Sequence, residues 1–306
     1  MKIYCVIVTY NGMPWIDWCL QGLQSSTVAI TPIIVDNCST DGTLARIEQN
    51  YPECVVLAQA RNLGFGQANN LGIQYALANE ASHVLLLNQD ATIQSDTLEK
   101  LLACDDGQHL LTPVHLNGKG NQIDPLFHAR TILGSAKQNG LVEDFLLRGA
   151  AKSYYEVEYV NAACWLLPKK VIEQIGGFNP LFTQYGEDDN YIQRVHYHHL
   201  GLRLIPNAFI YHDRKSAHGN EKMYRKGFLY RSLLLVKTNI NLSAKERFLF
   251  GHKLCVQELG AAILAHNGWR FIGEWFAAKW KLCRNRKAIR LSRQKEVIAS
   301  PNWLTL

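Results

Sequence analysis

Polar side chains follow each of four apolar runs in the first ninety residues, at the points where those runs end. The four groups are Thr9 with Tyr10 and Asn11, the stretch 36–42 beginning with Asp36, Arg61 with Asn62 and Gly64, and Asn88 with Gln89 and Asp90. In open parallel sheets, ligands bind outside the carboxyl ends of the strands. We therefore expect these groups to converge on one crevice, although any one of them alone is better explained as an ordinary turn.

Asp90 ends a strongly apolar run, where an unpaired carboxylate is costly. A divalent cation is a natural partner, because Mg²⁺ needs only one or two protein carboxylates and completes its shell with phosphate oxygens and water. Mn²⁺ shares this preference for oxygen ligands. One aspartate is therefore chemically sufficient to bind Mg²⁺ or Mn²⁺.

The segments that position these side chains have the pattern of an α/β protein. The apolar runs 3–8, 32–36, 54–59 and 83–88 lack period-two alternation, which is typical of strands buried on both faces of a parallel sheet. Most are followed by an amphipathic segment, and this order predicts a doubly wound α/β layer. After residue 107 the pattern loosens, which predicts loops around short strands.

From about residue 221 the chain has helical periodicity and many aromatic residues, so we expect a helical, basic C-terminal appendage (221–306) after a first domain (1–220). A basic cluster without an acidic residue closes this region: Lys279, Lys281, Arg284, Arg286, Lys287, Arg290, Arg293 and Lys295. A solvated helical face explains it plainly. The interleaved Trp and Phe favour an anionic membrane surface, and a homodimer interface is the alternative. Nothing resembles a nucleic-acid recognition module.

The lengths of the apolar runs and the spacing of the cysteines indicate the cellular compartment in which the protein folds. No run of about eighteen uncharged apolar residues exists, and the first run is too short for a signal peptide. The eight cysteines lie scattered without CxxC spacing, which indicates buried free thiols in a reducing compartment. We expect a cytoplasmic protein, peripheral on the inner face of the cell membrane.

Five motifs in consistent order carry a family resemblance. They are VTYNG (8–12), VDNCSTDGT (35–43), RNLGFGQANNLG (61–72), LLLNQDA (85–91) and GGFNPLFTQYGEDDNYIQR (176–194). Over residues 1 to 215 they resemble the family 2 glycosyltransferases, in particular the bacterial rhamnosyltransferase-like branch. The resemblance implies the GT-A fold, a Rossmann-like, mainly parallel sheet flanked by helices.

The resemblance also implies a donor and metal site. Thr9, Tyr10 and Asp36 would hold the nucleobase and ribose of a nucleotide-sugar donor. Other donor-binding positions would be Asn11, Arg61, Asn62, Gly64, Asn88 and Gln89. Asn88-Gln89-Asp90 stands where the family carries its DxD-type motif and keeps only the last acid, so Asp90 would be a metal ligand. His212 would be the second ligand, with His218 as its rival.

The acid cluster 187–189 would supply the catalytic base. Acids at the start of a helix are stabilised by the helix dipole, so the cluster alone establishes no function. By resemblance, Asp188 would be the base, with Asp189 as the alternative register, and Glu187 would help to position the acceptor. Trp165 and Tyr185 would stack on sugar rings, or else belong to the core.

The implied reaction is an inverting transfer of a sugar from dTDP-rhamnose or a UDP-sugar to a hydroxyl of a glycan or lipid-linked acceptor in cell-surface polysaccharide synthesis. A sugar nucleotidyltransferase is an alternative, but VTYNGMPW is no glycine-rich phosphate loop with basic residues. A dinucleotide oxidoreductase is disfavoured because GFGQANNLG does not match GxGxxG. A non-catalytic sugar-nucleotide-binding protein of the same fold remains open.

Overall fold

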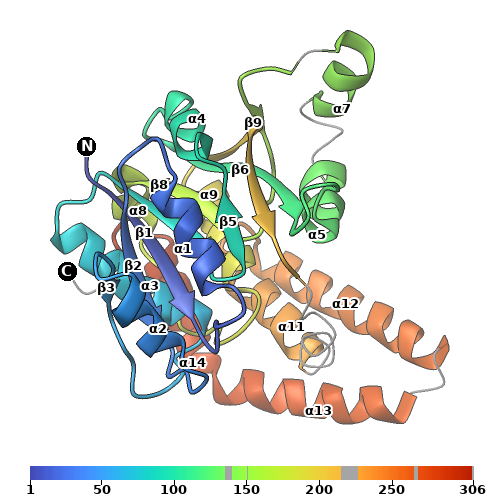
Figure 1. Ribbon diagram of the computed structural model, residues 1–306. Coiled ribbons are helices and arrows are strands. Elements are labelled where there is room, and N and C mark those ends of the chain that lie inside the picture. The colour runs from blue at the N-terminus through green and yellow to red at the C-terminus, as the bar shows by residue number, and fades with distance from the viewer. Residues whose placement is uncertain (135–139, 150, 215–226, 265–267, 305–306) are drawn as a thin grey trace.

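One mixed β-sheet forms the centre of the molecule (Figure 1). The computed structural model describes residues 1–134, 140–149, 151–214, 227–264 and 268–304. Within these ranges the sheet has nine strands in the order β3-β2-β1-β4-β8-β6-β9-β5, with β7 paired to β9. The strands are β1 (Ile3–Thr9), β2 (Thr31–Asp36), β3 (Val55–Val56), β4 (His83–Asn88), β5 (Ala91–Ile93), β6 (His109–Asn117), β7 (Tyr155–Glu156), β8 (Cys164–Pro168) and β9 (Gly201–His212).

The parallel sheet expected from the sequence occupies the first half of the chain. Strands β3, β2, β1 and β4 are all parallel, and the register pairs Thr9 with Asp36 and Val8 with Asn88. The polar groups that follow these strands therefore meet at one edge. Beyond β4 the sheet is mixed, because β8 runs antiparallel to β4 and to β6, whereas β6 and β9 are parallel.

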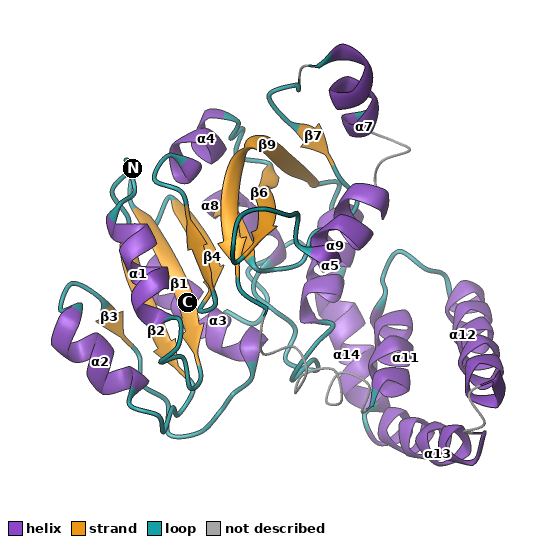
Figure 2. Ribbon diagram, turned by 45° about the vertical axis from the view of Figure 1, so that its right-hand side comes forward, coloured by secondary structure: helices purple, strands orange, loops and turns teal. Residues whose placement is uncertain are grey.

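Helices cover both faces of the sheet, as Figure 2 shows, and confirm the predicted α/β class. One face carries α1 (Ile16–Gln24), α2 (Thr43–Asn50) and α4 (Thr97–Ala103); the other carries α3 (Phe65–Ala78), α8 (Lys169–Ile175) and α9 (Glu187–Tyr197). Successive strand residues alternate between them, so Cys5 and Ile7 pack under α1 while Val6 packs under α3. Each fully buried Ile or Leu contributes about 1.5–3 kcal/mol to this packing.

The segment after residue 107 was expected to form loops around short strands; its described residues include the nine-residue strand β6 and several short helices. The helices are α5 (Pro125–Phe127), η1 (His128–Ile132), α7 (Leu141–Glu143) and η2 (Asp144–Arg148). Pro113 lies inside β6, and the register with β9 shifts between Pro113 and Val114. Proline cannot donate to a ladder, which explains why the sequence did not indicate a long strand here.

The helical C-terminal region is confirmed. It comprises α11 (Phe228–Thr238), α12 (Ala244–Leu264), α13 (Gly268–Arg284) and α14 (Arg286–Glu296). In Figures 1 and 2, α12 and α13 extend away from the sheet. The predicted domain boundary at residue 220 lies outside the described residues, so that division stays a prediction. In the described part of the chain, every helix is too short or too polar to traverse a bilayer.

Helix α14 returns to the sheet domain. The Asn179 amide donates to Glu296 Oε1 and to Ser292 Oγ, both at 2.7 Å, and the Asn190 amide donates to Glu296 at 3.1 Å. Glu296 is buried, and Leu304 packs in the core beneath α3 and α9. The end of the chain described here is therefore fastened to the segment that carries the acid cluster.

The cysteines are free thiols, as expected. Their predicted burial holds only in part. Cys5, Cys19 and Cys164 are buried within the sheet and α1, whereas Cys283 is exposed because it lies on the outer side of α13.

Candidate active site

A pocket of about 860 Å³ opens at the carboxyl ends of β1, β2 and β4, within the range of small-molecule sites. Nine predicted site residues line it: Tyr10, Asn11, Arg61, Asn62, Gly64, Asn88, Gln89, Asp90 and Tyr185. The polar tips therefore converge as the sheet topology required. Asn37, from the stretch 36–42 that was expected at this crevice, also lines it. Further polar or aromatic lining residues are Trp15, Phe65, Gln67, Thr183 and Gln184.

Thr9 and Asp36 were expected to contact the nucleobase and ribose, and this role stays a prediction. Both side chains are buried and neither lines the pocket. Thr9 Oγ1 donates to Asp36 Oδ1 at 2.9 Å, and the Ser39 main-chain N–H donates to Asp36 Oδ2 at 3.0 Å. Asp36 thus anchors the loop after β2, and its neighbour Asn37 is the residue at the pocket surface.

The loops after β1 and β4 are bound to each other. The Tyr10 N–H donates to Gln89 Oε1 at 2.9 Å, and Gln89 Nε2 donates to the Tyr10 carbonyl at 3.2 Å. The Asn11 side chain accepts from the Thr40 N–H at 2.9 Å. These side chains therefore fix the pocket wall, and their predicted contacts with a donor stay a prediction.

Gly64 brings two loops of the pocket into contact. Its backbone has φ 80° and ψ 171°, a region that essentially only glycine occupies. A Cβ atom at this position would lie 2.1 Å from the Thr183 carbonyl oxygen. The loop after β3 can therefore reach the 181–185 loop only with glycine here.

Gly64→Ala is expected to lower the free energy of unfolding by more than about 2 kcal/mol, since backbone strain of roughly 1–3 kcal/mol adds to the clash. Donor affinity should fall as well. Gly107→Ala is the matched control, because Gly107 also has a positive φ of 73° but nothing lies within 4 Å of its Cβ position. Urea unfolding of both variants checks this. Equal losses would show that contact with Thr183 is unimportant.

Asp90 and His212 lie together, as predicted for a pair of metal ligands. β5 pairs with the end of β9, which places His212 Nε2 3.3 Å from Asp90 Oδ1. Two ligands about 2.1 Å from one ion and at right angles are about 3.0 Å apart. The described residues contain no cluster of three or more His, Cys, Asp or Glu side chains suited to a metal. His218 lies outside the described residues.

Two further observations fit a metal at this pair. His212 Nδ1 lies 3.5 Å from buried Asp124 Oδ2, without a hydrogen bond between them. Asp124 is thus on the side of the ring where a carboxylate orients a ligating imidazole in metal sites. The buried Asn88 Oδ1 has no hydrogen-bond partner within the described structure. Burial lowers the pKa of His212, but Asp124 and Asp90 outweigh burial and raise it above its usual value. Asp124 was not foreseen, because it lies in the irregular segment after β6.

Asp188 lies in the first turn of α9, three residues after the pocket residue Tyr185. Its Oδ2 accepts a hydrogen bond from the Tyr159 hydroxyl at 2.9 Å. Burial and the neighbouring charge of Asp189 raise the pKa of Asp188, and the Tyr159 hydrogen bond and the charge of Arg130 oppose the rise. A carboxyl with a raised pKa is suited to accept a proton near neutral pH.

The structure separates the three acids of the cluster. Asp189 forms an ion pair with Arg130, whose guanidinium also lies 3.5 Å from the centre of the Tyr159 ring. Glu187 is buried, and burial together with the charge of Asp188 raises its pKa. Asp188 is thus a better candidate base than Asp189. Sequence patterns gave no signal for Arg130 or Tyr159.

Trp165 takes the position given as its alternative, in the core. Its ring is fully buried on β8 and stacks on Phe178 with ring centroids 6.0 Å apart. Tyr185, in contrast, lines the pocket and has a φ of 64°, which is strained for a bulky residue. Arg231 lies over its ring at 5.5 Å.

Known proteins are similar to this chain in sequence and in fold. The family model "Glycosyl transferase family 2" matches residues 4–176. The dTDP-rhamnosyl transferase RfbF of Shigella flexneri is 24% identical over 215 residues, covering 69% of each chain. The N-acetylglucosaminyl-diphospho-decaprenol L-rhamnosyltransferase of Mycobacterium tuberculosis is 24% identical over 238 residues, covering 71% of this chain and 77% of that one.

Two solved structures show the same architecture. TarS 1–349 of Staphylococcus aureus in complex with UDP-GlcNAc has a TM-score of 0.62 at 16% identity, covering 97% of this chain and 88% of that one. The mannosyltransferase PcManGT of Pyrobaculum calidifontis, in complex with GDP-Man and Mn²⁺, has a TM-score of 0.53 at 14% identity, covering 96% and 85%.

The fold, with its pocket at the carboxyl edge of the sheet, is the GT-A fold of these solved structures. This chain belongs to glycosyl transferase family 2, as the model match over more than half of its length shows. Its likeness to the rhamnosyltransferases of the family confirms the predicted branch. The enzyme class follows, and the nucleotidyltransferase and non-catalytic alternatives lose their support.

Proposed function

We propose that this enzyme transfers a sugar from a nucleoside-diphosphate donor to an acceptor hydroxyl with inversion at the anomeric carbon. Two observations support the proposal: Asp90 lines the donor pocket next to His212, and Asp188 lies on α9, three residues after the pocket residue Tyr185. Asp90 and His212, 3.3 Å apart, would serve as a ligand pair for a divalent metal, and Asp188, a carboxyl with a raised pKa, would serve as the base. One base without a second carboxylate serving as nucleophile favours a single displacement.

In this reaction the acceptor oxygen forms a bond to the anomeric carbon while the bond from that carbon to the diphosphate breaks. The acceptor proton moves to the Asp188 carboxylate, and the electron pair of the broken bond leaves with the nucleoside diphosphate. Mg²⁺ or Mn²⁺ bound at Asp90 and His212 would stabilise charge on the diphosphate. Tyr159 and Arg130 hold Asp188 and Asp189 in place.

The proposed donor is dTDP-rhamnose, with a UDP-sugar as the alternative. The names of the two rhamnosyltransferase relatives support the first, and UDP-GlcNAc in the TarS structure supports the second. The donor would lie against the loops after β1, β2 and β3, where the lining residues include Tyr10, Asn37 and Arg61.

The proposed acceptor is a hydroxyl of a glycan or lipid-linked glycan in cell-surface polysaccharide synthesis, reached from the cytoplasm at the inner face of the membrane. A second pocket, of about 570 Å³, supports an acceptor site, because it shares Thr183, Gln184 and Tyr185 with the first pocket. It lies between the 181–185 loop and helices α11 and α13. Tyr185 is the aromatic residue that we propose for stacking on the acceptor or donor sugar.

Release of nucleoside diphosphate tests the proposed function. The enzyme is incubated with dTDP-rhamnose or UDP-sugars, with and without Mn²⁺, and the product is examined by NMR. We expect metal-dependent release and an inverted anomeric configuration. Retention of configuration would overturn the single displacement, and absence of release with every donor would overturn the donor class.

The pH dependence of kcat should report the environment of Asp188. The ionised carboxylate is the active form, so activity is present above its pKa and is lost as the pH falls through it. Tyr159→Phe removes a hydrogen bond that lowers this pKa and should move the acid limb of the profile to higher pH. Asp189→Asn removes a negative charge that raises it and should move the limb to lower pH. Shifts in the same direction for both variants would contradict the assignment of the base.

A further inference from the structure

Helices α12 and α13 expose an unusual number of large apolar side chains. Trp269 is 85% exposed, Phe248 68%, Phe276 62% and Trp280 60%. Monomeric soluble proteins rarely expose a large contiguous apolar patch, and such a patch usually marks an interaction site.

The exposed side chains form one stripe on each helix. On α12, Phe248, Val256, Leu259 and Ile263 recur at helical spacing, and on α13, Trp269, Ile272, Phe276 and Trp280 do so. Spacings of three and four residues place each set on a single face. We name the two sets together the α12–α13 face.

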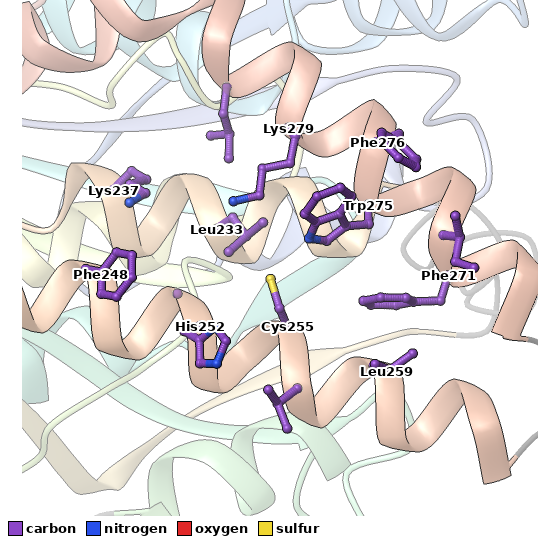
Figure 3. A pocket seen from close by; sticks show the side chains of 14 residues that line it. Leu233, Lys237, Phe248, His252, Cys255, Leu259, Phe271, Trp275, Phe276 and Lys279 are labelled. Carbon is purple, nitrogen blue, oxygen red and sulfur yellow. The ribbon is translucent and has the colours of Figure 1, made fainter.

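A groove of about 480 Å³ lies between α11, α12 and α13 and adjoins this face. Figure 3 shows Leu233 of α11, Cys255 of α12 and Trp275 of α13 around it. Most of its lining residues are apolar, and its volume is within the range of about 300–1,000 Å³ for small-molecule sites.

Positive charge gathers at one part of the groove. Lys237 and Lys279 line it, and Figure 3 shows their side chains extending into the same space. Burial lowers the pKa of Lys237, and the nearby charges of Lys279, Arg247 and Arg293 lower it further. Among the described residues, neither lysine has an ion-pair partner. An anion at this position would relieve the repulsion between them.

The positive charge of the chain is concentrated in the helices that form this groove and face. Residues 244–296 contain twelve Lys and Arg but four Glu, so the positive excess of the whole chain resides in this region. Lys279 lies over the Trp275 ring at 5.4 Å and Arg284 over the Trp280 ring at 5.3 Å. Basic residues interleaved with Trp on an amphipathic helix are typical of segments that lie in the interface of an anionic membrane.

We propose that the α12–α13 face docks on an anionic phospholipid bilayer, with one acyl chain in the groove and its phosphate at Lys237 and Lys279. The complementarity of a basic, aromatic surface to anionic headgroups selects this occupant over a second copy of the chain, whose like charges would repel. The inference rests on the proposed function in one respect, namely that a lipid-linked acceptor lies in the same bilayer.

Co-sedimentation with vesicles tests the proposal. The full chain is mixed with vesicles of phosphatidylcholine containing about one third phosphatidylglycerol, or with pure phosphatidylcholine, at low and high salt. We expect binding to the anionic vesicles only, weakened by salt. Trp269→Ser with Phe276→Ser and Trp280→Ser, and separately Lys237→Gln with Lys279→Gln, should each lower the bound fraction at least about tenfold.

Leu147→Ser is the matched control, because Leu147 is 81% exposed but lies on η2, away from these helices. It should bind like the unaltered chain. Donor cleavage without vesicles should be unchanged in all three variants, which shows that they fold and separates a failure of docking from a failure of the proposed function. Equal binding to both vesicle types, or unchanged binding by either multiple variant, would overturn the proposal. A dimer that the triple variant dissociates, without vesicle binding, would reassign the face to self-association.

Discussion

Replacing Asp188 with Asn is expected to lower kcat for sugar transfer by about 10²–10⁴-fold, the usual contribution of a general base. Asn has nearly the same shape and can still accept the Tyr159 hydrogen bond, but it cannot take up the acceptor proton. The affinity for nucleoside diphosphate should change little, because Asp188 does not line the donor pocket. Steady-state transfer rates and calorimetric titration with the diphosphate measure the two quantities.

Asp189→Asn is the control for Asp188→Asn, since the two residues are adjacent and carry the same charge. Asp189 is engaged by Arg130, so its replacement should shift the pH profile while leaving most of the turnover at its optimum. If Asp189→Asn abolished turnover and Asp188→Asn did not, the base would be Asp189 and the register of the motif would be displaced by one residue.

Replacing Asp90 with Asn is expected to lower metal-dependent turnover by about 10²–10³-fold, which is the size of loss seen when one preorganised charge-stabilising group is removed. The carboxylate faces the pocket and His212, and no second acid stands at Asn88 to take its place. Chelation of metal from the unaltered enzyme should produce a similar loss. In the Asp90→Asn variant, chelation should then cause little further loss, because both changes remove the same interaction.

Asn88→Asp offers the reverse test of the metal site. It adds a carboxylate beside His212, since the Asn88 amide nitrogen lies 3.4 Å from His212 Nε2. The concentration of Mn²⁺ needed for half-maximal turnover should fall in this variant and rise in Asp90→Asn.

The chelation experiment has its own contradicting outcome. If the losses from chelation and from Asp90→Asn were additive, Asp90 would act independently of a metal.

The first half of the sheet was predictable because its strands are apolar on both faces and occur in a regular βαβ order. The antiparallel position of β8 could not be predicted, because an apolar run such as CWLLP does not indicate the direction of its strand or which strand lies beside it. Strand β6 was hidden because Pro113 interrupts its pattern, and its pairing with β9 joins residues far apart in the sequence.

At the candidate active site, too, some residues could be placed from the sequence and others could not. Side chains that follow parallel strands, such as Asn88 and Asp90, could be placed because topology brings those ends together. Sequence could not show that Asn37 lines the pocket while Asp36 binds Thr9 and Ser39, because adjacent residues at a strand end carry no pattern that separates these positions. Arg130 reaches Asp189 from an irregular segment without a pattern.

The attachment of Glu296 to Asn179 and Asn190 has a consequence during translation. Glu296 lies 117 positions after Asn179 and 106 positions after Asn190. Helix α9, which carries the proposed base, is therefore synthesised well before the helix α14 that binds to it. At about 5–20 residues per second, this interval is roughly 5–20 seconds. During that time the donor half of the pocket has all of its strands, whereas the buried amides of Asn179 and Asn190 still lack the carboxylate that holds them. A nascent chain would therefore complete the strands at the donor pocket before α9 gains its contact with α14.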